Sequence, residues 1–262
     1  MISDGSESKN HFISSSRISS IQFFPSGTDE NLEIGNVNLW NKDIFKDSVP
    51  VTGGAYDIRM GTTEMKFKCE TCFNTKLNCP GHPGYINLRY PVKNPFFRDE
   101  LWKWLKVICF ECGHPLLTRI VRCPKSTRLQ EYVKLSTHIE NCERCGADHP
   151  KISKDKIMGM RFYMTKKNAA KTEPEIQRDL YNHHIENIVN RIPDIVVLKM
   201  GKPLTAHPKK FILRCIIAAP NTVRPDIRKI GGLRSSNDDI TTLLKNIIEI
   251  NNSLPNIIPD LD

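Results

Sequence analysis

The stretch KCETCFNTKLNCPGHPGY, residues 68–85, places three cysteines and one histidine close together. They follow the order Cys69, Cys72, Cys79 and His82, with two residues inside each pair. Two thiolates from one tight turn grip a Zn²⁺ ion at roughly 2.3 Å, and a pair from a facing turn completes a tetrahedron. Four protein ligands leave no open coordination position. We therefore predict a structural zinc ion at this stretch, with no catalytic role.

A second set of paired cysteines follows, at Cys109 with Cys112 and at Cys142 with Cys145. Each pair is followed by glycine, the residue that best relieves strain where a metal knuckle turns. The segment between the pairs is longer than in a short zinc ribbon, so we expect it to carry its own structure. We predict a second structural zinc ion held by these four cysteines.

Further thiols and imidazoles lie outside the two sets. His114, Cys123 and His149 are near the second set and offer spare ligands; we interpret Cys123 as an ordinary, partly buried thiol. Cys215 falls inside an apolar run and is predicted to be a core residue. His183 and His184 are expected on the solvated face of a helix.

The N-terminus and the length of the apolar runs indicate the cellular location of the protein. The N-terminus is rich in serine and lacks the basic-then-apolar layout of a signal peptide. No apolar run approaches the roughly 20 residues that a membrane span needs. We therefore expect an intracellular protein without a membrane partner, whose nine cysteines stay reduced.

Positive charge is concentrated late in the chain. The formal net charge is +9, and the segment 201–235 alone has eight Lys or Arg and one acid, a net charge of +7. Such a charge predicts an acidic partner but says nothing of the fold. The candidate contacts surround a Gly-Gly hinge in this segment: Arg224, Arg228, Lys229 and Arg234.

Apolar spacing predicts the main helices and one strand. Apolar residues recur at helical intervals over 97–108, and a Thr172 cap with Glu175 predicts a helix over 172–192. Residues 209–219 read as a buried strand ended by Pro220. After it, Asn237 is predicted to cap an amphipathic helix with this apolar stripe: Ile240, Leu243, Leu244, Ile247 and Ile248.

Several of these stretches together resemble one family. The order YDIRMGT, KCETC, CPGHPGYINL, PVKNPFF and VICFECGHPLL resembles the N-terminal clamp region of the largest subunit of multisubunit DNA-dependent RNA polymerases. HPKKFILRCIIAAPNTVRPDI is similar to that family's strand before Arg-Pro, and SSNDDITTLLKNIIEIN to its following clamp helix. The resemblance covers roughly residues 18–255. The Asn- and Ile-rich style is similar to versions from large cytoplasmic DNA viruses.

The resemblance implies a fold and a division of the chain. We expect an α+β fold, a zinc-stapled irregular clamp domain with short antiparallel strands and several helices. Residues 1–17 would form a flexible Ser-rich tail. Residues 18–150 would form a clamp head with both zinc sites, and residues 151–262 a clamp core with helices, a buried strand and the basic loop.

The resemblance also implies a role in DNA-templated RNA synthesis. The family's largest subunit continues to an Asn-Ala-Asp-Phe-Asp-Gly-Asp motif that holds the catalytic magnesium, and no Asp-x-Asp-x-Asp occurs here. The chain is therefore expected to be a fragment or split subunit of a nucleotidyltransferase, inactive alone and without bound magnesium. It would grip DNA through Arg224, Arg228, Lys229 and Arg234, although these cations could instead be solvated or contact a neighbouring subunit.

The implied partners are DNA, the RNA–DNA hybrid, the remainder of the largest subunit, the second-largest subunit and other polymerase subunits. The implied location is the host cytoplasm or virion for a viral protein and the nucleus otherwise. Two alternatives stay open at this point. One is a free-standing zinc-binding regulator, and the other is a single-strand nucleic-acid binder.

Overall fold

The computed structural model of the chain describes residues 18–47, 49–119, 121–155, 161–166, 176–225, 227–228 and 235–255. The α-helices of these residues are α1 (Thr28–Ile34), α2 (Arg98–Val107), α3 (Arg128–Ser136), α4 (Asn182–Asn190), α5 (Asp194–Lys199) and α6 (Asp239–Ser253). Short 3-10 helices are η1 (Ile58–Met60), η2 (Leu204–Ala206), η3 (Pro208–Phe211) and η4 (Asn221–Val223). The strands are β1 (Val37–Asn38), β2 (Phe45–Lys46), β3 (Val49–Pro50), β4 (Gly84–Lys93), β5 (Lys151–Lys154), β6 (Phe162–Lys166), β7 (Ile176–Asp179), β8 (Ile212–Ala218), β9 (Ile227–Arg228) and β10 (Ser235–Ser236).

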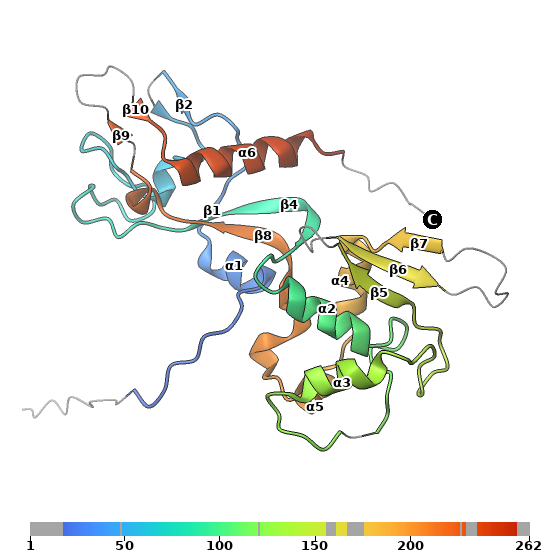
Figure 1. Cartoon of the computed structure of the whole chain (residues 1–262). Helices are drawn as coiled ribbons and strands as arrows, with labels where there is room; N and C mark the ends of the chain where they lie inside the picture. The colour runs from blue at the N-terminus through green and yellow to red at the C-terminus, as the bar shows by residue number, and fades with distance from the viewer. Residues whose placement is uncertain are drawn as a thin grey trace, which may run out of the picture.

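A three-stranded sheet with the order β1-β4-β8 lies between α6 and α1 (Figure 1). β4 pairs antiparallel with β8 from Gly84 opposite Ala218 to Lys93 opposite Ile212, with a register shift between Asn87 and Val92. β1 pairs parallel with the start of β4. The expected mixture of helices and short sheets is confirmed, although one pairing is parallel and β4 was not anticipated.

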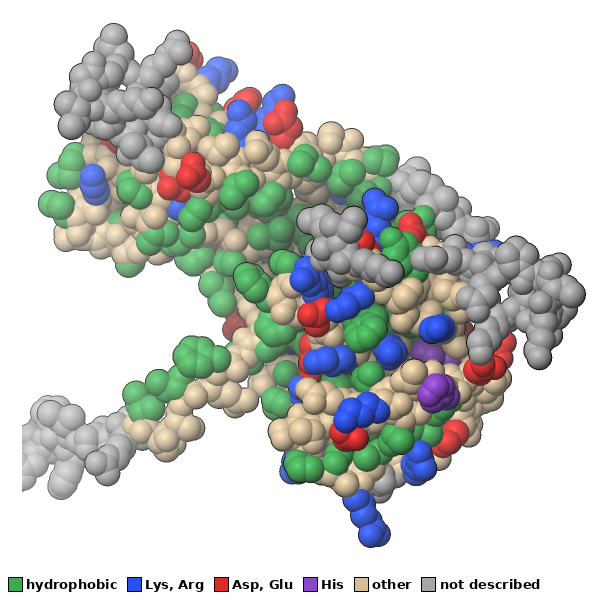
Figure 2. All heavy atoms as spheres, in the orientation of Figure 1, with side chains coloured by type: hydrophobic (Ala, Val, Ile, Leu, Met, Phe, Trp, Pro, Cys, Tyr) green, Lys and Arg blue, Asp and Glu red, His purple; other side chains and the backbone are tan. Residues whose placement is uncertain are grey.

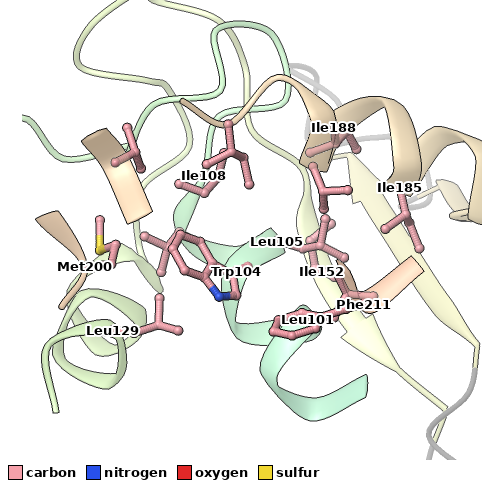
Figure 3. Close-up of a cluster of buried hydrophobic side chains, with 14 of the residues drawn as sticks. Leu101, Trp104, Leu105, Ile108, Leu129, Ile152, Ile185, Ile188, Met200 and Phe211 are labelled. Atoms are coloured by element: carbon pink, nitrogen blue, oxygen red, sulfur yellow. The ribbon is translucent and has the colours of Figure 1, made fainter. Parts of the chain in front are cut away.

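Two clusters of buried apolar side chains form the core. In the larger one, side chains of α2 meet side chains from α3, β5, α4 and η3 (Figure 3). Trp104 lies at its centre, 1% exposed. The smaller cluster packs residues of β1, η1 and β4 against Leu244 and Ile248 of α6. Both clusters draw residues from either side of residue 150, and the expected division there stays a prediction.

The predicted helix over 97–108 is confirmed as α2, and the predicted strand is confirmed as β8, where Cys215 is fully buried. Because burial of an apolar side chain contributes roughly 1.5–3 kcal/mol, the aromatic and aliphatic face of α2 is a major source of stability. Among the helices of the described residues, no helix has the length and apolar character that crossing a bilayer needs.

Two predicted helix starts are wrong. The helix expected over 172–192 begins at Asn182, because residues 176–179 pair instead with β6 as strand β7. Thr172 and Glu175 of the expected cap lie outside the described residues. At α6 the capping residue is Asp238, not Asn237: its carboxylate accepts a hydrogen bond from the Ile240 amide at 2.9 Å.

A buried arginine ties distant segments together. Arg224 is 0% exposed, and its guanidinium donates hydrogen bonds to the carbonyl oxygens of Ala219 and Ala55, both at 2.9 Å. It also donates to Asn221 Oδ1 at 3.0 Å and to Thr241 Oγ1 at 2.7 Å. A side chain with no exposed surface cannot reach a phosphate. The structure therefore contradicts the prediction that Arg224 contacts DNA and gives it a structural role.

We expect Arg224→Met to lower the free energy of unfolding by about 3 kcal/mol or more, because several buried acceptors lose their donor. Urea denaturation of the metal-loaded protein measures this decrease. Arg214→Met is the matched control: Arg214 pairs with Glu186 but its side chain is 50% exposed, so the decrease should stay below about 1 kcal/mol. Equal decreases in the two variants would contradict the structural role of Arg224.

Candidate functional site

The first set of predicted ligands comes together in the loop between η1 and β4. One ligand atom from each of Cys69, Cys72, Cys79 and His82 lies within 4.8 Å of the others, and the Sγ atoms of Cys72 and Cys79 are 3.6 Å apart. Sulfur atoms at 2.3 Å from a tetrahedral Zn²⁺ ion are about 3.8 Å apart. The donor set and its spacing therefore fit one ion of this kind.

Electrostatics of the first cluster also fit a cation. Burial raises the pKa of Cys79 to about 11, whereas the neighbouring imidazole of His82 lowers the pKa of Cys72 to about 6. Nε2 of His82 is buried and has no hydrogen-bond partner among the described residues. Such orphaned polar atoms are rare. A cation at the centre would satisfy this nitrogen and allow neighbouring thiols to be ionised together.

Local backbone geometry explains why the sequence folds this way. The amide of Phe73 donates to the Cys69 carbonyl at 2.8 Å, which closes the first knuckle. Gly81 has a φ of +84°, and a Cβ there would collide with Thr222 in η4. The predicted bend at Pro80-Gly81 is thus confirmed, and it lets the loop approach the end of β8 closely.

The second set of predicted ligands also comes together. The Sγ atoms of Cys109 and Cys145 are 3.6 Å apart, and those of Cys112 and Cys142 are 3.8 Å apart. Burial raises the pKa of Cys109 to about 12. Gly113 after the first pair has a φ of +67°, and a Cβ there would strike the Arg191 carbonyl. The expected structure between the two pairs is present as α3.

The spare ligands lie outside both groups of four. His114 Nδ1 is 2.8 Å from the Cys112 carbonyl oxygen, and Cys123 is partly buried with its Sγ 3.9 Å from the Val121 carbonyl. Burial lowers the pKa of His149 to about 4. These placements fit ordinary packing roles.

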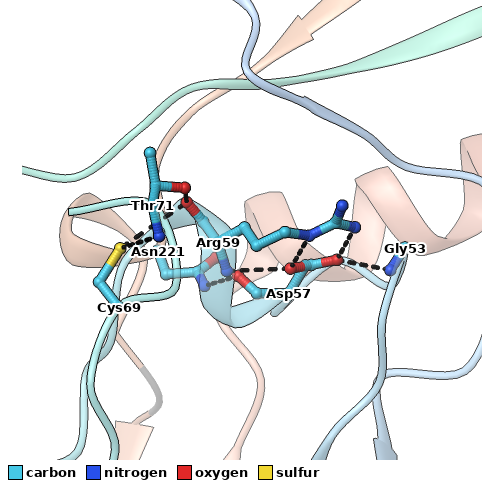
Figure 4. Close-up of polar contacts among 6 residues, drawn as sticks. All are labelled: Gly53, Asp57, Arg59, Cys69, Thr71 and Asn221. Atoms are coloured by element: carbon cyan, nitrogen blue, oxygen red, sulfur yellow. Dashed lines mark hydrogen bonds and ion pairs between the residues drawn. The ribbon is translucent and has the colours of Figure 1, made fainter. Parts of the chain in front are cut away.

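A buried carboxylate, that of Asp57, is linked through Arg59 to Cys69 of the first cluster (Figure 4). Asp57 is 2% exposed and accepts hydrogen bonds from the Gly53 amide at 2.6 Å and from Arg59, whose Nε is at 3.0 Å. The Arg59 carbonyl in turn accepts from Thr71 Oγ1 at 2.6 Å and lies 3.8 Å from Cys69 Sγ. Burial alone would raise the pKa of Asp57, but these donors lower it below its usual value.

Asn221, which is distant in the sequence, joins the same network and donates hydrogen bonds to the carbonyls of Asp57 and Gly61, both at 2.8 Å. Sequence reasoning missed this support. The stretch YDIRMGT contributed only to the family resemblance, and no short-range sequence pattern links Asp57 to Asn221. The signal that could have found it is the Asp-x-Arg spacing beside a ligand loop.

Several cations of the basic segment 201–235 are already paired with carboxylates of this chain. Lys202 pairs with Glu100 at 2.6 Å, and Lys210 and Arg214 pair with Glu30 and Glu186. Of the remaining candidates, Arg228 lies in β9, while Lys229 and Arg234 lie outside the described residues.

The two adjacent histidines differ from the solvated pair that the sequence predicted. His183 and His184 are half-buried with their Nε2 atoms 3.0 Å apart, and the ring of Tyr181 stacks on His183. They pack against each other and against this tyrosine at the start of α4.

Comparisons with known proteins agree on one family. The family model of RNA polymerase Rpb1, domain 1, matches residues 15–260. The chain is 33% identical over 241 residues to a DNA-directed RNA polymerase RPB1 homolog of African swine fever virus, covering 91% of this chain and 16% of that protein. It is 32% identical to the RNA polymerase subunit Rpo1N of Thermoplasma acidophilum, covering 92% of this chain and 28% of that subunit.

A eukaryotic relative is the RNA polymerase II subunit RPB1 of Euplotoides octocarinatus, which is 29% identical over 91% of this chain and 54% of the relative. The chain thus spans about a sixth of the length of the viral relatives that it matches.

We expect the protein to bind two zinc equivalents and Asp57→Asn to weaken only the first cluster, by roughly tenfold or more. The physical reason is that an asparagine side chain has one acceptor oxygen, whereas both oxygens of the Asp57 carboxylate accept hydrogen bonds. The Asp57→Asn variant therefore cannot accept from both Arg59 and the backbone N–H of Gly53, and the backbone next to Cys69 loses support. Elemental analysis gives the stoichiometry, and competition with a chromophoric zinc chelator gives the two affinities.

Asp99→Asn is the matched control, because Asp99 is an exposed carboxylate paired with Lys154 at 2.8 Å and forms no part of either ligand set. It should leave both affinities unchanged. A stoichiometry near one, or equal weakening of both sites in Asp57→Asn, would contradict the account of the two clusters.

Proposed function

The chain belongs to the RNA polymerase Rpb1 domain 1 family, and from this premise we propose that it forms the N-terminal clamp portion of the largest subunit of a DNA-directed RNA polymerase. The observation that carries the proposal is the family match over residues 15–260, which includes both complete ligand sets. The relatives' names specify DNA-directed RNA synthesis.

We further propose that both ligand sets hold structural zinc. Three cysteines with one histidine, and four cysteines, are donor sets that zinc favours. Each set leaves no position for substrate. A bound ion would contribute free energy of folding directly to irregular loops that bury little apolar surface of their own.

The proposed contribution to transcription is a DNA grip without catalysis. No Asp-x-Asp-x-Asp motif occurs in the sequence, so catalytic magnesium would be held by another part of the enzyme. The proposed contacts are Arg228, Lys229 and Arg234, which would neutralise phosphates without reading bases. The proposed protein partners are the remainder of the largest subunit, the second-largest subunit and other polymerase subunits, with DNA and the RNA–DNA hybrid as ligands.

The alternatives, a zinc-binding regulator and a single-strand nucleic-acid binder, have no observation in their favour. For location, we propose the host cytoplasm or virion if the protein is viral and the nucleus otherwise. The division into a tail (1–17), a clamp head (18–150) and a clamp core (151–262) stays part of this proposal.

Affinity purification of the tagged chain from cells that produce it should recover polymerase subunits, identified by mass spectrometry. The recovered assembly should incorporate nucleotides on a DNA template, because it contains the magnesium aspartates. The chain purified alone should not. Robust incorporation by the isolated chain, or recovery without any polymerase subunit, would overturn the proposed function.

The triple variant Arg228→Ala/Lys229→Ala/Arg234→Ala tests the DNA contact in the assembled enzyme. The slope of log affinity against log salt should flatten by about 0.9 for each phosphate that the protein no longer neutralises, similarly for unrelated duplex sequences. Metal content and subunit composition serve as controls and should not change. An unchanged slope together with dissociation of subunits would identify the segment as a protein interface instead.

A further inference from the structure

Four lysines lie on helix α2 and the adjacent strand β5, and two of them contact the ring of Trp102. We name this group the α2–β5 lysine face: Lys103 and Lys106 of α2, and Lys151 and Lys154 of β5. Nζ of Lys106 lies 4.5 Å and Nζ of Lys154 lies 5.1 Å from the centre of the Trp102 ring. In Figure 2, Lys and Arg side chains gather over the region of α2 and β5.

The charges of this face are only partly compensated. Lys103 pairs with Glu100 at 3.2 Å, and Lys154 pairs with Asp99 at 2.8 Å. Lys106 and Lys151 form no ion pair with any other described residue, so the face keeps an excess of positive charge. Burial, and next the charge of Lys151, lower the pKa of Lys106.

The face is also rigid. α2 buries Leu101, Trp104 and Leu105 in the larger core cluster, and β5 buries Ile152 there while pairing with β6. The Trp102 ring restricts two of the lysine side chains through cation–π contacts. A ligand that binds to such a preorganised surface loses less free energy in ordering it.

We propose that the α2–β5 lysine face binds the phosphate backbone of duplex DNA, in addition to the contacts proposed for Arg228, Lys229 and Arg234. Lysine acts as a flexible point charge and fits phosphate without demanding a fixed orientation. The face has no arginine, asparagine or glutamine to read base edges, so binding is independent of sequence. The choice of DNA among polyanions rests on the proposed function; the need for a polyanion rests on the charges alone.

The test uses the full chain with both metal sites loaded and two unrelated DNA duplexes, with binding followed by fluorescence anisotropy. For Lys106→Gln/Lys151→Gln, the slope of log affinity against log salt should flatten by about 1.8 on both duplexes. Between about 50 mM and 200 mM salt, the decrease in affinity should therefore be about tenfold smaller than in the unchanged chain. Glutamine keeps most of each stem, so folding and zinc content should be preserved.

Lys134→Gln is the matched control, since Lys134 is 71% exposed on α3 and pairs with Glu131 at 2.8 Å. It should change the slope much less than the double variant. The proposal is overturned if the unchanged chain does not bind duplex DNA at about 50 mM salt, or if the double variant keeps the full slope. Binding of polyglutamate is measured in the same way. If the double variant weakens binding of polyglutamate but not of DNA, the proposal is also overturned, and the face is a site for an acidic protein.

The same experiment separates this proposal from the proposed function. A flattened slope in a chain that recovers no polymerase subunit would leave the lysine face standing and remove the polymerase assignment. If the slope is unchanged in the double variant but the tagged chain does co-purify with polymerase subunits, the polymerase assignment stands and the lysine face is ruled out as a DNA site.

Discussion

The antiparallel pairing of β4 with β8 is the contact on which the other features depend. It joins segments far apart in the sequence, from Gly84 opposite Ala218 to Lys93 opposite Ile212. Ile86 and Ala218 at one end belong to the smaller core cluster, and Ile212 at the other end belongs to the larger one. Because β4 begins just after His82, the same pairing also fixes the first ligand loop against η4.

Polar contacts at the end of β8 complete this arrangement. Arg224 links α6 to the segment around Ala55, while Asn221 links η4 to the backbone that holds Asp57. Each of these side chains is buried, and each donates hydrogen bonds to acceptors from distant parts of the chain. Such networks are stabilising only when every member is satisfied, so they specify one arrangement of the segments. The first ligand cluster sits on this network.

The two proposed contacts with nucleic acid lie in different regions. β9, which contains Arg228, and its partner β10 are at one end of the molecule in Figure 1, and α2 and β5 are towards the other. The two cysteine clusters also lie in different regions. The first is beside η4, and the second begins directly after α2. Two such cationic sites on one molecule would contact DNA at two places without reading its sequence.

The sequence by itself determined both ligand sets, helix α2 and strand β8, because each depends on residues close together: knuckle spacing, glycine at a turn, or apolar periodicity. It also determined the family, through motifs that keep their order along the chain. Only the tertiary structure decided that residues 176–179 pair as a strand, that Arg224 is buried, and that Asp57 supports Cys69. Each of these outcomes depends on a partner distant in sequence. The charge of Arg224 predicted exposure, and the acceptors from Ala55 and Thr241 that make its burial favourable come together only when the chain folds.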